Sequence, residues 1–152
     1  MSRRASWSIL VLTLATSIGI SATAAAQSTC APTHRISATQ GNAASQLAGG
    51  AHDDVSPVNG QVVTIEGVIV GDFQSIPQST RAGELRGFLI EEETADQDAD
   101  PSTSEGLFVF SGSFPVLDVH EGERVCVTGP VSEFFGMSQI TATAAGSLVL
   151  TA

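Results

Sequence analysis

Short runs of β-branched and apolar residues, separated by polar and glycine-rich segments, occupy this chain from residue 61 onward. Five runs are long enough to form strands: 62–70, 85–91, 107–110, 124–134 and 137–142, with 148–150 extending or following the last. In the fourth run Val125, Val127 and Val131 alternate with other residues, which predicts one inward face and places Cys126 on the outer one. No segment shows the apolar spacing of a long amphipathic helix. The pattern therefore predicts an all-β domain, either a small barrel or a sandwich.

The segment 27–60 lacks this alternation and is rich in Ala, Ser, Gly, Gln and Asn. We expect an irregular lead-in there, with one short extended piece near His34–Ser37, and the barrel over 61–152. Gly67 lies inside the first predicted strand. A glycine in that place predicts a β-bulge or a sharp bend, which a small closed barrel needs.

The N-terminus has the three parts of an export signal. Arg3 and Arg4 form a positive start, an apolar run covers 9–20, and small residues at 24–26 fit a cleavage site. The apolar run is shorter than the roughly 20 residues that a membrane-spanning helix needs. We therefore expect a signal peptide over 1–26, no membrane span after its removal, and a mature protein that is secreted or periplasmic.

Export changes the interpretation of the two cysteines, Cys30 and Cys126. In an oxidising compartment an even pair predicts one disulfide bond. The alternative is a catalytic or metal-binding thiol, but the sequence contains no Cys-x-x-Cys motif to support it.

The chain is strongly acidic, with a formal net charge of −10. It has no lysine, and two of its six basic residues lie in the predicted signal, which leaves 4 Arg against 16 acids, or −12. This balance is the opposite of the basic surface typical of a general nucleic-acid binder.

Acidic residues gather in the segment between the second and third predicted strands. Four of them are candidate ligands for Ca²⁺: Asp96, Asp98, Asp100 and Glu105. The match to an EF-hand loop fails, because Pro101 stands where glycine is needed and Leu107 where glutamate is needed. The alternative is a solvated acidic loop, or one capped by the hydroxyl side chains of residues 102–104.

Four stretches, at 63–74, 85–91, 98–109 and 121–136, resemble in order and spacing the OB-fold domain of large secreted bacterial nucleases. In that family the OB-fold domain precedes a catalytic domain of the endonuclease/exonuclease/phosphatase type. The resemblance covers about residues 33–145. It implies a five-stranded OB-fold-like Greek-key barrel, and OB-folds bind oligonucleotides or oligosaccharides on one open face.

The resemblance also indicates which residues would contact such a ligand. The candidates are Arg81, Arg86, Phe108 and Phe110. We expect Phe88 in the core. Phe108 and Phe110 share one face of their strand and Leu107 and Val109 share the other, so only one pair faces inward, and the pattern leaves both choices open.

The printed chain does not contain the catalytic domain of such nucleases, nor a Gly-x-Ser-x-Gly, P-loop or Gly-x-Gly-x-x-Gly motif. We therefore expect a non-catalytic binding module whose ligand is single-stranded nucleic acid or a glycan. The alternative is a structural or protein-interaction domain, or the N-terminal fragment of a longer secreted endonuclease.

Overall fold

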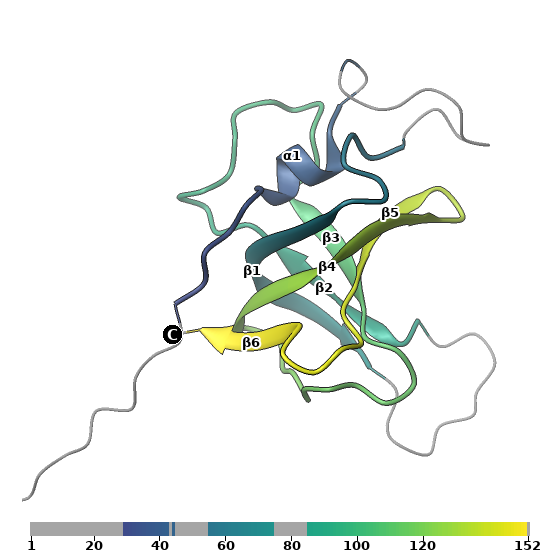
Figure 1. Cartoon of the computed structure of the whole chain (residues 1–152). Helices are drawn as coiled ribbons and strands as arrows, with labels where there is room; N and C mark the ends of the chain where they lie inside the picture. The colour runs from purple at the N-terminus through teal and green to yellow at the C-terminus, as the bar shows by residue number, and fades with distance from the viewer. Residues whose placement is uncertain (1–28, 43, 45–54, 75–84, 152) are drawn as a thin grey trace, which may run out of the picture.

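The computed structural model describes residues 29–42, 44, 55–74 and 85–151 (Figure 1). The predicted signal peptide, 1–26, and the candidate ligand contact Arg81 lie outside the described residues. Within the described part of the chain, no helix is long and apolar enough to cross a membrane.

One short helix and six strands make up the regular structure of the described residues. Their bounds are α1 (Ile36–Gln40), β1 (Val62–Phe73), β2 (Gly87–Glu91), β3 (Gly106–Phe110), β4 (Arg124–Phe134), β5 (Met137–Thr141) and β6 (Leu148–Thr151). The all-β prediction is confirmed.

The strands β1 to β5 close into a barrel in the order β1-β2-β3-β5-β4 and back to β1. All neighbours are antiparallel except β3 and β5, which run parallel. The strand β6 adds to β4 outside this ring. The predicted five-stranded OB-fold-like barrel is thus confirmed, with one additional strand.

Barrel closure depends on β1, which pairs with β4 along its first half and with β2 along its second half. The bulge in this strand lies between Ile69 and Gly71, not at Gly67 as the sequence predicted. At Gly67 the reason for a glycine is crowding, because an added Cβ would lie 2.9 Å from the Glu91 carbonyl oxygen and 3.1 Å from the Ile36 side chain.

The core fills the barrel with the inward side chains of every strand. Val125, Val127 and Val131 all belong to it, as their alternation predicted. One end of the barrel receives Ile36, the first residue of α1, whose side chain is 0% exposed. The expected extended piece near His34–Ser37 was therefore wrong. The helix forms here because the Ile36 side chain is buried against the barrel. This contact involves residues far away in the sequence, so the residues next to Ile36 could not predict it.

A disulfide joins Cys30 to Cys126, as predicted, and fastens the lead-in to the outer face of β4. Next to it the lead-in follows β1: the Thr33 amide donates to the Thr64 carbonyl oxygen at 2.8 Å, and the Thr64 amide donates to Thr33 Oγ1 at 2.9 Å. A disulfide is compatible with the extracellular or periplasmic location expected from the sequence.

Candidate functional site

The structure decides which face of β3 is buried. Leu107 and Val109 belong to the core, so Phe108 and Phe110 lie on the outer face of the barrel. Phe88 is in the core, as predicted. Of the seven phenylalanines in the chain, Phe88 and Phe108 are buried, Phe108 at 4% exposed, which leaves five that are at least partly exposed.

The β1 bulge adds one more aromatic side chain to this outer face. Beyond the bulge Phe73 pairs with Gly87, and Gly87 pairs in turn with Phe110 on β3. Directly opposed residues of neighbouring strands project to the same side of a sheet. Because the extra residue in β1 reverses its alternation, Phe73 faces outward beside Phe110.

A groove of about 530 Å³ lies on the outer side of β3 and β5, between the residues that precede β2 and the end of β4. Its lining residues are Leu85, Arg86, Phe108, Phe110, Phe134, Met137 and Gln139. Three of them are phenylalanines and none is acidic. This size and mixture, a mainly apolar wall with few polar groups, is that of a small-ligand site.

Gly87 has no side chain, and this leaves space for the Phe108 ring that forms one wall of the groove. An added Cβ there would lie 2.5 Å from Phe108 Cζ and would overlap the Val109 carbonyl oxygen. The Phe108 ring therefore occupies the space that a larger residue would take. Gly87 is a requirement of the groove that the sequence pattern did not single out.

Arg86 enters the groove from a left-handed backbone conformation, with φ of 55°. Its carbonyl oxygen accepts hydrogen bonds from the amides of Ser111, at 3.0 Å, and Gly112, at 3.1 Å. These two bonds hold a conformation that is uncommon outside glycine. In the described part of the chain the ion pairs involve Arg35 and Arg124, which leaves the Arg86 guanidinium without a carboxylate partner.

The β4–β5 hairpin extends the aromatic surface beyond the groove. Its two-residue turn is Phe135-Gly136, with φ of 51° and 80°. The Phe135 ring is 91% exposed and meets Phe134 edge-on, with centroids 4.7 Å apart. Turns with two positive φ values favour Asn-Gly, so a phenylalanine here costs stability.

Replacing Phe135 by asparagine is expected to raise the free energy of unfolding by about 0.5–1 kcal/mol, because it relieves a strained turn. Chemical denaturation measures this gain. Phe114→Asn, at another exposed phenylalanine with no positive φ, is the matched control and should give no gain. If the Phe135→Asn variant were less stable than the unmodified protein, the interpretation that Phe135 strains the turn would be wrong.

In the acidic loop between β2 and β3, carboxylates accept hydrogen bonds from other residues of the same loop. Asp98 Oδ1 accepts from the Asp100 amide at 2.7 Å and from Thr103 Oγ1 at 3.0 Å. Asp100 Oδ1 accepts from the Ser102 hydroxyl at 2.6 Å. These bonds to Ser102, with one from Asn42, lower the pKa of Asp100.

The remaining two candidate calcium ligands are also engaged. Asp96 forms an ion pair with Arg35 at 2.7 Å, and Glu105 Oε1 accepts from the Asp98 amide at 3.1 Å. Among the residues that the structure describes, no three His, Cys, Asp or Glu side chains lie together in a way that could hold a metal ion. All four candidate ligands thus make hydrogen bonds or ion pairs within the loop or to the lead-in, and calcium binding by the loop stays a prediction.

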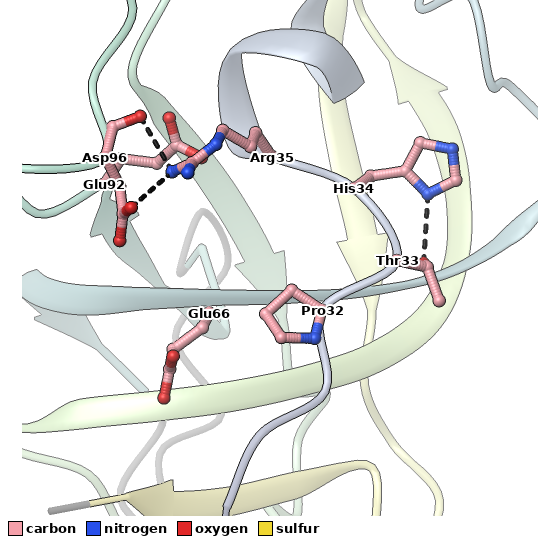
Figure 2. Close-up of a pocket in the computed structure, with 7 residues that line it drawn as sticks. All are labelled: Pro32, Thr33, His34, Arg35, Glu66, Glu92 and Asp96. Atoms are coloured by element: carbon pink, nitrogen blue, oxygen red, sulfur yellow. Dashed lines mark hydrogen bonds and ion pairs between the residues drawn. The ribbon is translucent and has the colours of Figure 1, made fainter.

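A second, smaller pocket of about 280 Å³ lies between the lead-in and the barrel (Figure 2). Its lining residues are Pro32, Thr33, His34, Arg35, Glu66, Glu92 and Asp96. Glu92 is 5% exposed, and its burial, together with a hydrogen bond to Glu105, raises its pKa to about 7. The sequence pattern does not single out Glu92, because its burial comes from the lead-in packing over it.

No family model and no curated protein matches this chain. The fold and the geometry of the groove therefore carry the functional argument.

Proposed function

We propose that this protein is a secreted, non-catalytic OB-fold module that binds an extended ligand with flat rings in the groove on the outer side of β3 and β5. A short single strand of nucleic acid is the first ligand to test. The observation that carries the proposal is the placement of the aromatic side chains: five of the seven phenylalanines lie outside the buried core, and Phe110 and Phe134 line one groove beside the buried Phe108 and with Arg86, which has no ion-pair partner among the described residues.

The chemistry of the groove suits stacking. Each base that stacks on an aromatic side chain contributes about 1–3 kcal/mol, largely irrespective of base identity. Phe110 and Phe134 supply such rings, and Arg86 supplies one positive charge for a phosphate or another anionic group. The resemblance to the OB-fold domain of secreted nucleases also supports this proposal, because OB-folds bind their ligands on one open face that includes the second and third strands.

Charge limits what this groove can hold. With one arginine in its lining it can neutralise one phosphate, so binding of a single strand should follow a slope of about −0.7 in log affinity against log salt. The acidic loop lies on the other side of the barrel from the β4–β5 hairpin in Figure 1, away from the Phe134 end of the groove.

The absence of nuclease activity belongs to the same proposal. Hydrolysis of a phosphodiester needs a metal or cationic clamp and a group that activates water. The carboxylates of the acidic loop are engaged in bonds within the loop and to the lead-in, and the described arginines other than Arg86 form ion pairs with Asp96 and Glu93.

Docking of a protein is the second candidate function. The net charge of −10 opposes a polyanion, whereas an apolar peptide segment with one carboxylate would suit both the phenylalanines and Arg86.

Nuclear magnetic resonance titration of the mature protein with an oligothymidine of about 10 nucleotides tests the proposal. Shifts are expected at Arg86, Phe110 and Gln139. Phe110→Ala and Arg86→Gln should each weaken binding by about tenfold. Phe114→Ala, an exposed phenylalanine outside the groove lining, is the matched control and should bind like the unmodified protein.

Two results would contradict this proposal in different ways. Unchanged affinity in both groove variants would place the ligand elsewhere. Failure of both the oligothymidine and a neutral oligosaccharide to bind would exclude the ligand class and favour a protein partner for the groove.

A further inference from the structure

The positive charge of the groove lies at one end of it. The sheet order β2-β3-β5-β4 fixes the order in which the lining residues follow one another across the strands. Arg86 directly precedes β2, and Phe110 ends β3. Gln139 lies within β5, and Phe134 ends β4. A ligand that crosses these strands therefore meets the Arg86 guanidinium at one end and the Phe134 ring at the other.

This guanidinium is available to an anionic group of a ligand. Among the described residues, the ion pairs are those of Arg35 with Asp96 and of Arg124 with Glu93. The groove lining contains no acidic residue and no second basic residue. In a chain with a formal net charge of −10, the groove thus offers a single positive charge, and it offers it at one end only.

Gln139 places one hydrogen-bonding group in the middle of the groove. The residue is 8% exposed and pairs with Phe108 on one side and Ser132 on the other. Its Nε2 donates to Ser132 Oγ in a long hydrogen bond of 3.4 Å, and no described residue donates to its Oε1. A ligand ring with an N–H group, such as a nucleobase, can donate to this oxygen.

The distance across the strands limits how much of a nucleic-acid strand the groove can hold. Neighbouring strands lie about 4.8 Å apart, so the path from β2 through β3 and β5 to β4 spans about 14 Å. With bases stacked at about 3.4 Å per nucleotide, this length holds about four nucleotides. Each of them brings a phosphate, whereas the lining holds one arginine. The middle of a long strand would therefore place most of its phosphates against an apolar wall on an acidic protein.

The phosphorylated end of a strand suits this distribution of charge better. A terminal phosphate monoester carries a charge of about −1.5 to −2 at neutral pH, more than an internal diester carries. Two of its oxygens can accept parallel hydrogen bonds from one guanidinium. A short strand that ends at Arg86 thus places its highest charge on the arginine of the lining and its bases on the phenylalanine rings.

We propose that the groove recognises the phosphorylated end of a short strand: Arg86 binds the terminal phosphate, Gln139 accepts a hydrogen bond from a base, and Phe110 and Phe134 stack on bases. This inference rests on the function proposed above and narrows its ligand from single strands in general to strand ends. The 5′ and 3′ ends can carry the same phosphate group, so the test includes both.

Calorimetric titration of the mature, disulfide-bonded protein with oligothymidine tetramers tests the proposal. One tetramer carries a 5′-phosphate, another a 3′-phosphate, and the third has hydroxyl groups at both ends. One of the phosphorylated tetramers should bind about tenfold tighter than the hydroxyl-ended one, because it adds a charge-assisted pair of hydrogen bonds. A decamer with the same phosphorylated end should bind within about twofold of its tetramer, since the groove holds about four nucleotides.

Variants assign this preference to one residue. Arg86→Gln should bind all three tetramers alike, whereas Arg86→Lys should keep part of the preference, since lysine retains the charge and loses the planar fork. Gln139→Met removes a hydrogen-bond acceptor and no charge, so it should weaken all three tetramers and leave their ratios unchanged. Arg35→Gln, which removes the same charge outside the groove lining, is the matched control and should bind like the unmodified protein.

The phosphorus-31 resonance of the terminal phosphate keeps the test valid if Arg86→Gln does not fold. In the unmodified protein this resonance should shift when the preferred tetramer binds. A resonance that stays in place while the tetramer is bound would overturn the proposal.

Failure of end recognition and failure of the proposed function give different results. Equal affinity of the three tetramers for the unmodified protein, with resonance shifts at Phe110 and Gln139, would overturn end recognition and leave the groove as a strand-binding site. A preference that persists in Arg86→Gln, or disappears in Arg35→Gln or Gln139→Met, would overturn the role of Arg86. If neither the tetramers nor the decamer bound, both proposals would be wrong.

Discussion

Replacing Cys30 and Cys126 together by serine is expected to lower the free energy of unfolding by about 2–5 kcal/mol. The bond joins residues 96 positions apart, so it removes a large amount of conformational freedom from the unfolded chain. It also fastens the lead-in that carries α1 to the outer face of β4. The variant should therefore lose protection at α1 as well as overall stability. Urea denaturation measures the first effect and amide exchange the second.

The unmodified protein in reductant provides the control for this variant, because it loses the bond while keeping both side chains. Reduced protein and the double serine variant should unfold at similar urea concentrations. If the oxidised and reduced proteins were equally stable, the disulfide would have no role in holding the lead-in.

Gly87→Ala is expected to lower the free energy of unfolding by about 2–3 kcal/mol, because the new Cβ would overlap the Val109 carbonyl oxygen and press on the Phe108 ring. Relief requires the pairing of β2 with β3 to open or Phe108 to leave its position. Either movement changes a wall of the groove, so the variant should also bind the oligothymidine more weakly. Chemical denaturation and the titration described above measure the two effects.

Gly106→Ala is the matched control, since Gly106 lies at the other end of the same strand pair. An added Cβ there would lie 3.7 Å from the Ile90 carbonyl oxygen, an ordinary contact, and the free energy of unfolding should change by no more than about 0.5 kcal/mol. Equal effects of the two substitutions would show that loss of glycine flexibility, not crowding at Phe108, is responsible.

Local alternation was sufficient to predict the strands and much of the core. Val125, Val127 and Val131 could be assigned to the inward face because side chains of a strand alternate between its two sides. The same rule placed Cys126 outside, and the export signal predicted from the sequence made its pairing with Cys30 the expected outcome. The inward and outward faces depend on residues close in sequence. The disulfide could be predicted because the chain has only two cysteines, so each has one possible partner within the chain.

Contacts between distant segments decided the remaining features. The same alternation that separated Phe108 and Phe110 from Leu107 and Val109 did not say which pair faces inward, since both are apolar. Closure of the barrel resolved it, because the β3 side chains that meet Ile140 of β5 and the rest of the core are those of Leu107 and Val109. The groove exists because the opposite face is also apolar.

The lead-in shows most clearly what neighbouring residues cannot determine. Ile36 begins a helix where the sequence favoured an extended piece, because its side chain enters the barrel and its amide meets Glu92, 56 positions away. The pKa of Glu92 is raised to about 7 for the same reason, because packing of the lead-in removes its carboxyl group from water. A short helix and a carboxyl pKa both follow from burial, and burial is a property of the folded chain.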